Sequence, residues 1–242
     1  MTSDRIRTTH AGSLARPAEL IPLIWAKEEG REYDRADFEA QAAAAVADVV
    51  ARQVGAGIDV VGDGEQSKSS FRQYINERLS GFEVLADRRA ADFTTSREWL
   101  AFPEFYAGVE FAHRSARVLA CTGPVAYTGW DDLRLDLENL GAAVKATQPA
   151  EVFVTAVSPA YGAATAANEH YATYEEYEVA WADAVRSEYR AIIDAGYLLQ
   201  IDDPRWITYY TLHPEMSVED WRKWAAARVE VINYALRGLP QD

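Results

Sequence analysis

The sequence predicts an α/β fold in a single domain, residues 1–242, built from about five strand–helix units. Short and nearly continuous apolar strands alternate with helical segments, which is the pattern of a parallel sheet covered by helices. Of the 242 residues, 49% are hydrophobic and 12% aromatic, enough for one large core. Polar, glycine-bearing turns follow the strands, and folds of this kind carry their chemistry there.

The first half of the chain predicts two strands with a long helix between them. The first strand is short, at residues 8–11, and the helix covers residues 36–54, where its apolar face ends at Gly55. The second strand, residues 58–61, runs directly into the polar turn at residues 62–65. This turn is therefore a candidate position for functional side chains.

The second half continues the alternation after a long insertion. Residues 82–115 mix aromatic and charged side chains without a clear period, and we expect them to separate the second and third strands. Three further strands are predicted at residues 117–121, 151–157 and 197–201. Helices are predicted over residues 131–145 and 174–195, and a last helix starts near Ser217 and ends at Gly238.

Composition narrows the classes of partner. The chain carries 38 acidic and 24 basic residues, a net charge of −14, so its field repels phosphate backbones and anionic membrane surfaces. The sequence contains no run of about 18 apolar residues, the length that could span a bilayer. The single cysteine, Cys121, allows neither an internal disulfide framework nor a zinc site with several thiolates from this chain alone. We expect a cytoplasmic protein without nucleic-acid or membrane partners.

Polar side chains gather where the predicted strands end. Because the carboxyl ends of parallel strands lie on one face, we expect these side chains to converge there. They are His10 and Ser13, Asp63 and Glu65, Thr122, Ser158, and Asp202 with Asp203.

Five motifs at these strand ends, in the same order, resemble the catalytic domain of the cobalamin-independent methionine synthases and their single-domain relatives, including the epoxyalkane coenzyme M transferases. The motifs are Thr8 to Ser13, Asp63 to Lys68, Thr122 to Pro124, Val157 to Pro159, and Leu199 to Pro204. The helix from Arg228 to Gly238 is similar to the one that usually precedes the family's sixth strand. The resemblance implies a (β/α)8 TIM barrel, of which this chain has only the first five units.

The resemblance also implies a reaction. Members of this family alkylate a thiol: a bound zinc ion turns the thiol into a thiolate, which attacks an electrophilic carbon such as the methyl group of methyltetrahydrofolate. Their zinc ligands follow the sixth, seventh and eighth strands, so no metal ligand is expected in this chain. The expected function is a subunit of a zinc-dependent alkyl or methyl transferase acting on a thiol, with folate as a candidate methyl donor.

Five strands of an eight-stranded barrel would leave two open edges and an uncovered apolar interior, which favours aggregation. We therefore expect a second small subunit, of about 100–150 residues, that completes the barrel and supplies the zinc ligands. A truncated or inactive fragment is the alternative.

Four carboxylates at the strand ends are candidates for binding and catalysis. Glu65 could hold the ammonium group of an amino-acid substrate through a charge-assisted hydrogen bond, with Asp63 beside it. Alternatively, Glu65 is an acid at the N-terminus of a helix starting near Ser70. The resemblance implies that Asp202 contacts the substrate, while Asp203 either joins it or caps the loop.

The other candidates have equally plain structural alternatives. Gly12 and Ser13 could hold a substrate carboxylate or simply form a tight turn. His10 is a candidate general acid, although a lone histidine is more often structural. The resemblance places Trp130 at an aromatic wall beside the electrophile, but tryptophan is also common in barrel shells. Ser158 completes the expected substrate-binding set.

Two other functions remain open. The first is a metal-free lyase or decarboxylase of the same superfamily, similar to uroporphyrinogen decarboxylase, which would need a positively charged pocket. Only Lys68 and Arg205 supply basic groups near the strand ends, so we favour this reading less. The second is a non-catalytic structural subunit, against which the retained polar residues at all five strand ends count.

Overall fold

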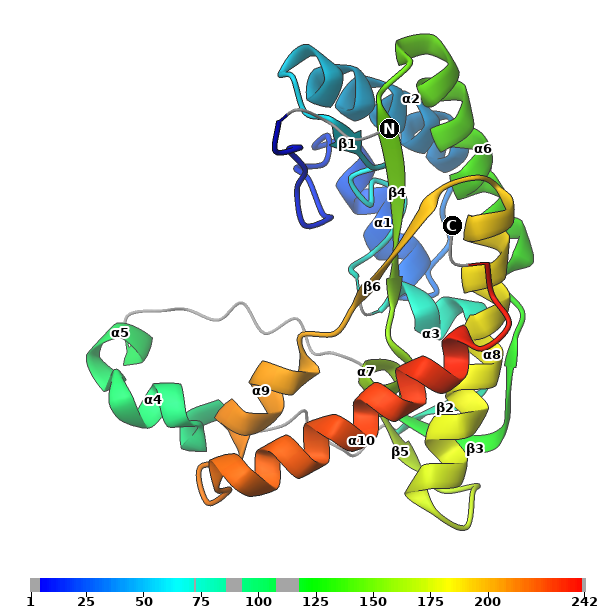
Figure 1. The fold of residues 1–242 in the computed structure, drawn as a ribbon. Helices are drawn as coiled ribbons and strands as arrows, with labels where there is room; N and C mark the ends of the chain where they lie inside the picture. Colours follow the sequence, from blue (N-terminus) through cyan, green and yellow to red (C-terminus); the bar gives the residue numbers. More distant parts are fainter. Residues whose placement is uncertain (1–4, 72, 86–92, 108–117, 241–242) are drawn as a thin grey trace.

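A parallel sheet forms the centre of the computed structural model, which describes residues 5–71, 73–85, 93–107 and 118–240 (Figure 1). Its strands are β1 (Val60–Val61), β4 (Glu151–Val157) and β6 (Leu198–Asp202), in the order β1-β4-β6. The expected first strand lies beside β1, because the Thr8 carbonyl accepts hydrogen bonds of 3.1 Å from the main-chain N–H groups of Asp59 and Val60. The α/β fold is confirmed.

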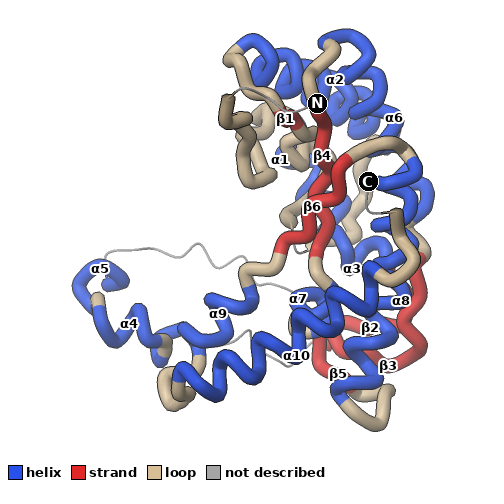
Figure 2. Tube along the Cα trace, viewed as in Figure 1, coloured by secondary structure: helices blue, strands red, loops and turns tan. Residues whose placement is uncertain are grey.

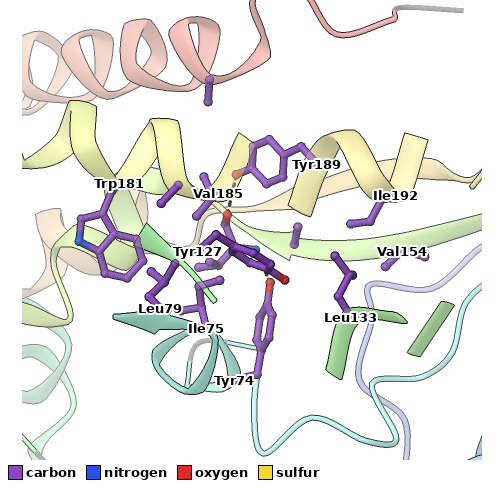
Figure 3. Packing of buried hydrophobic residues seen from close by; sticks show 14 of the residues in the cluster. Tyr74, Ile75, Leu79, Tyr127, Leu133, Val154, Trp181, Val185, Tyr189 and Ile192 are labelled. Atoms are coloured by element: carbon purple, nitrogen blue, oxygen red, sulfur yellow. Dashed lines mark hydrogen bonds between the residues drawn. The ribbon is translucent and has the colours of Figure 1, made fainter. Parts of the chain in front are cut away.

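Long helices cover this sheet (Figure 2). They are α1 (Leu20–Glu28), α2 (Arg35–Gly55), α6 (Trp130–Thr147) and α8 (Tyr174–Asp194). The last three confirm the helices predicted at 36–54, 131–145 and 174–195 to within about two residues. Buried residues of α2, α6 and α8 share one core with the strands, which includes Tyr189, Ile192 and Val154 (Figure 3). Within it α8 contacts β4 and β6, and α2 contacts β1 and α6, while α1 packs on α2. No helix within the described ranges is long and apolar enough to cross a membrane.

The final helix, α10 (Val218–Leu236), begins as the sequence indicates. The Ser217 hydroxyl accepts a hydrogen bond of 3.1 Å from the Asp220 N–H, so Ser217 is its N-cap. Gly238, with a φ of 75°, follows its end. The shorter helices are α3 (Tyr74–Arg78), α7 (Pro159–Ala163) and α9 (Arg205–Leu212).

The prediction that residues 117–121 form a strand of the central sheet is wrong. Residue 117 lies outside the described ranges, and residues 118–121 begin β3 (Val118–Tyr127). This strand pairs antiparallel with β2 (Leu79–Leu85) and parallel with β5 (Ala166–Asn168) in a second sheet. The motif from Thr122 to Pro124 therefore lies inside β3, not at a strand end. Gly81 of β2 permits this pairing, because a Cβ there would lie 2.5 Å from the Pro124 carbonyl oxygen. The described part of the central sheet thus holds four of the five expected segments.

The predicted insertion, residues 82–115, contains the end of β2, the 3-10 turn at Phe93–Thr95, α4 (Arg97–Ala101) and α5 (Pro103–Ala107). Its residues 86–92 and 108–115 lie outside the described ranges. Arg97 donates hydrogen bonds to the carbonyl oxygens of Tyr210, His213 and Met216. These bonds attach α4 to the segment from α9 to α10. The helices α4, α5 and α9 and the start of α10 extend away from the central sheet (Figure 1), whereas the end of α10 packs against α8.

Candidate functional site

A tight turn after β1 brings Glu65 into the protein interior, where the side chain is 1% exposed. Glu65 has a φ of 55°, a left-handed conformation that costs a non-glycine residue about 1–3 kcal/mol. Asp63 accepts a hydrogen bond of 2.9 Å from the Glu65 N–H, and Arg16 donates 2.8 Å hydrogen bonds to the carbonyl oxygens of Glu65 and Lys68. These bonds hold the strained turn in place.

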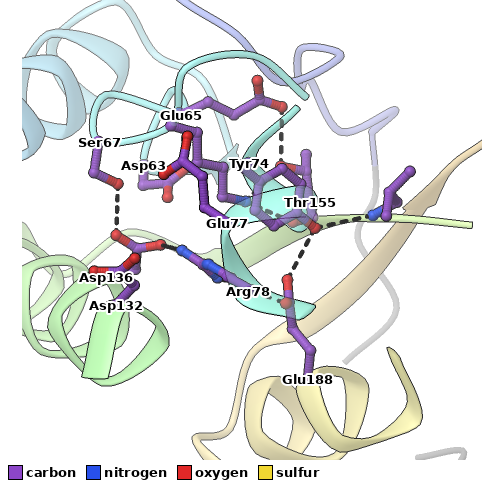
Figure 4. Close-up of polar contacts among 12 residues, drawn as sticks. Asp63, Glu65, Ser67, Tyr74, Glu77, Arg78, Asp132, Asp136, Thr155 and Glu188 are labelled. Carbon is purple, nitrogen blue, oxygen red and sulfur yellow. Dashed lines mark hydrogen bonds and ion pairs between the residues drawn. The ribbon is translucent and has the colours of Figure 1, made fainter. Parts of the chain in front are cut away.

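Two hydroxyl groups orient the Glu65 carboxylate. Ser13 donates a short hydrogen bond to Oε2. Thr155 of β4 donates one of 3.0 Å to Oε1 (Figure 4). Gly12 lies against the same carboxylate, because a Cβ at this position would be 2.9 Å from Oε1. The helix-N-terminus reading of Glu65 does not fit, since α3 begins at Tyr74 and the Glu65 carboxylate binds across to two other segments.

Asp202 lies at the end of β6, close enough to Glu65 for their charges to interact. Burial raises the pKa of Asp202; a hydrogen bond from Gln200 lowers it, and the charge of Glu65 raises it again. The Gln200 side-chain amide donates to both the Ala11 carbonyl, at 2.6 Å, and Asp202, at 2.8 Å. Through Gln200, the first-strand loop and the end of β6 are joined beside the carboxylates.

Ser158 and Asp203 form a separate pair. Ser158, which follows β4, donates a hydrogen bond of 2.6 Å to Asp203 and caps α7 by accepting from the Tyr161 N–H. Asp203 also accepts from the Arg205 N–H at 3.0 Å, as expected of a loop cap. Burial raises the pKa of Asp203, whereas the bond from Ser158 lowers it. Both side chains thus have partners within the protein.

His10 lies apart from this cluster, against α2. Its Nε2 is 2.8 Å from the Gln53 side-chain oxygen, which also accepts from the Gly62 N–H, while the Gln53 amide nitrogen donates to the Gly62 and Val49 carbonyls. The Gln53 oxygen is therefore an acceptor, and His10 Nε2 carries the proton. This arrangement supports a structural role for His10: it binds Gln53, which in turn holds the Gly62 backbone at the start of the turn that leads to Glu65.

Trp130 is also not among the residues gathered around Glu65. It is the first residue of α6, is 52% exposed, and packs edge-on against Tyr127 with ring centres 4.9 Å apart. With Leu133 and Ala191 it lines a hollow of about 300 Å³ between α6 and α8, in the outer helix layer. The structure thus brings together Gly12, Ser13, Asp63, Glu65 and Asp202.

A buried network of charged side chains lies next to the site (Figure 4). Arg78 pairs with Asp136, and its Nη1 is 3.6 Å from Glu188; all three side chains are at most 6% exposed. Tyr74 and Tyr127 donate to the two Glu188 oxygens at 2.9 and 2.8 Å. Burial, followed by the charge of Glu188, raises the pKa of Tyr74.

Sequence reasoning missed Thr155, Arg16 and this network, and valued Lys68 only as a basic group. Thr155 left a signal, since it is the one polar residue inside the apolar run from Val152 to Val157. Arg16 gave none, because its main partners are backbone carbonyls.

Asp63 leads to a prediction about pH. Burial raises the pKa of Asp63, so its carboxyl group holds a proton to a higher pH in the folded state than in the unfolded chain. The contribution of this group to stability is therefore lost as pH rises above about 4. Asp63→Asn keeps an oxygen for the Glu65 N–H and cannot ionise. We expect its stability relative to wild type, measured by urea unfolding, to increase from pH 4 to pH 7. A decrease over that range would show that the ionised carboxylate stabilises the fold.

The described residues do not fit a zinc site. No group of three or more His, Cys, Asp or Glu side chains within these ranges is placed to hold a metal ion. Cys121 lies buried in β3, where its thiol donates to the Gly123 carbonyl and burial raises its pKa.

Comparison with known proteins places this site in context. The chain is 26% identical over 234 residues to a methionine synthase of Sulfolobus acidocaldarius, and 26% identical over 245 residues to one of Thermococcus kodakarensis. It covers 58% of each relative, so it spans less than two thirds of their length. No family model matches it.

Solved structures show the same fold. A B12-independent methionine synthase from Shewanella sp. W3-18-1, in complex with selenomethionine, aligns with 96% of this chain at a TM-score of 0.63 and 22% identity, over 58% of its own length. A putative vitamin-B12 independent methionine synthase from Listeria monocytogenes aligns with 99% of this chain, over 64% of its own length, at a TM-score of 0.63 and 19% identity. The resemblance of this chain to the cobalamin-independent methionine synthase family is thereby confirmed over nearly its whole length.

Proposed function

We propose that this chain is part of a zinc-dependent alkyl or methyl transferase acting on a thiol, and that Glu65 binds the ammonium group of its amino-acid substrate. The observation that carries the proposal is the buried Glu65 carboxylate, which two hydroxyl groups and a strained turn hold in one orientation. Strained, buried polar residues concentrate at functional sites. The curated relatives named methionine synthase supply the reaction class.

The charges of the site favour a cationic group. Asp63, Glu65 and Asp202 lie near one another, while the basic groups of Lys68 and Arg16 bind protein oxygens. A decarboxylase of the same superfamily would need basic groups that are available to substrate carboxylates. The transferase therefore agrees better with this arrangement than the metal-free alternative does.

Replacement of Glu65 tests the proposal. We expect Glu65→Gln to weaken binding of L-methionine, used as the probe in isothermal titration calorimetry, by about tenfold to a hundredfold, because a charge-assisted hydrogen bond contributes about 1.5–3 kcal/mol. Glu39→Gln is the matched control: Glu39 pairs with Arg35 on the surface of α2, at 2.7 Å, and no change in affinity is expected. Equal affinities of wild type and the Glu65 variant would exclude Glu65 from the site.

We further propose that a second subunit packs against β6 and brings the zinc ligands. In the described part of the chain no strand pairs with the outer edge of β6, where Leu198 is 49% exposed. Beyond it, none of the residues of α9 is buried, Ile207 is 66% exposed, and Ala235 is the one buried residue of α10. An open strand edge beside exposed apolar groups favours a partner.

Native mass spectrometry with zinc quantification tests this second proposal on protein isolated from its own source. The expected result is a heteromer with one zinc per pair. A zinc-free species that contains only this chain would contradict the proposal. So would stoichiometric zinc in the isolated chain, because the ligands would then lie within it.

A further inference from the structure

Lys68 is the most deeply buried basic side chain near Glu65, at 2% exposed. Its ammonium nitrogen lies 2.8 Å from the Thr155 carbonyl oxygen and 3.3 Å from the Thr155 hydroxyl oxygen. It also lies over the ring of Tyr74, 4.5 Å from the centroid. The ammonium group is therefore enclosed by protein groups from β4 and α3.

These contacts fix the direction of a proton. An ammonium group only donates hydrogen bonds, so the Thr155 hydroxyl oxygen must accept from Lys68. The one hydroxyl proton of Thr155 is then free to point to Glu65 Oε1, 3.0 Å away, where a carboxylate oxygen accepts it. We propose that Lys68 is a positioning residue, which orients the Thr155 hydroxyl toward Glu65 and so holds that carboxylate ready for its ligand. This inference rests on the proposed function.

The alternative is that Lys68 only balances nearby charge. It interacts electrostatically with Asp63 of its own turn, Asp136 of α6 and Asp202 of β6, and Arg78 of α3 pairs with the same Asp136. Charge balance would not depend on the Thr155 hydroxyl, whereas positioning requires it. Variants of Thr155 therefore separate the two roles.

The test compares four variants of the full chain. Lys68→Met removes the ammonium group, Thr155→Val removes the hydroxyl but leaves the charge, and Thr155→Ser restores the hydroxyl. Lys27→Met is the matched control, because Lys27 also pairs with two carboxylates, Glu77 at 3.3 Å and Asp132 at 2.8 Å, neither of which the site uses.

Two readouts are expected to agree. Affinity for L-methionine falls about tenfold in both Lys68→Met and Thr155→Val, is recovered largely in Thr155→Ser, and is unchanged in Lys27→Met. The second readout is the 13C resonance of the Glu65 side-chain carboxyl, recorded at a fixed pH without ligand. It moves in Lys68→Met and Thr155→Val, and it does not move in Thr155→Ser or Lys27→Met. Such a response follows from a lost hydrogen bond and not from general destabilisation.

The outcomes distinguish this inference from the proposed function. If wild type does not bind L-methionine, the proposed function fails, and the ligand-free Glu65 resonance still decides the role of Lys68. If that resonance is unchanged in Lys68→Met, or if Thr155→Val binds as wild type does while Lys68→Met does not, positioning through Thr155 is overturned.

Discussion

Gly12→Ala is expected to reduce the affinity for L-methionine by at least about a hundredfold while the chain still folds. Its φ of 153° is unfavourable for any side chain, and the new Cβ would lie 2.9 Å from Glu65 Oε1 and 3.2 Å from Thr155 Cγ2. The carboxylate must move away from the position that the Ser13 and Thr155 hydroxyls define. A displacement of this size at a group that binds the ligand lowers the affinity by orders of magnitude.

Two glycine controls separate the causes of that loss. Gly57 has a φ of 80° with nothing within 4 Å of a Cβ, so Gly57→Ala adds backbone strain alone, about 1 kcal/mol in unfolding free energy. At Gly55 a Cβ likewise meets nothing within 4 Å, and its conformation is not left-handed. Both should bind L-methionine as wild type does in the same calorimetric titration. If Gly12→Ala also binds L-methionine with the wild-type affinity, then either Glu65 does not bind the ammonium group or binding does not depend on the exact position of the Glu65 carboxylate.

Local patterns predicted the helices well, because the relevant physics is local. The apolar period of 3.6 residues located α2, α6 and α8, and a side-chain cap located the start of α10 at Ser217. The turn around Glu65 could also be expected, since an apolar strand followed by Gly62 and Gly64 leaves little else for that segment to form.

Pairing between distant segments could not be predicted in the same way. The apolar run at the start of β3 suits any sheet, and its assignment depends on β2, where Gly81 lets the two backbones approach. The role of His10 depends on Gln53, 43 residues away in sequence, which fixes which ring nitrogen carries the proton. The exposure of Trp130 follows from its position beside the hollow between α6 and α8, which the sequence of one helix alone does not reveal.

The convergence of carboxylates was predictable only in part. The rule that parallel strand ends share one face correctly brought Asp202 near Glu65. The same rule could not reveal Arg16 and Thr155. Arg16 bonds to the Glu65 and Lys68 carbonyls, and Thr155 bonds to the Glu65 carboxylate. These bonds depend on side-chain reach and on the left-handed conformation at residue 65. The side chains that orient the site are thus less visible in the sequence than those expected to bind.

Arg78→Met is expected to lower the free energy of unfolding by about 3–5 kcal/mol, because it removes the ion-pair partner of the buried carboxylates of Asp136 and Glu188. Arg134→Met is the matched control: Arg134 pairs with Asp131 at 2.9 Å, but the two side chains are 65% and 74% exposed. There the loss should stay below about 1 kcal/mol. Urea unfolding at pH 7 measures both.

The pH dependence of the Arg78→Met loss distinguishes a lost charge pair from poor packing. Burial opposes ionisation of Asp136, but Arg78 and Lys68 outweigh it and lower its pKa, so the pair stabilises wild type above the unfolded pKa of about 4. Without Arg78 the folded-state pKa of Asp136 rises, and the folded variant takes up a proton as pH falls. The deficit relative to wild type should therefore shrink between pH 7 and pH 4, whereas a packing defect would leave it constant. A constant deficit, or one no larger than in Arg134→Met, would mean that the network does not depend on the Arg78 charge.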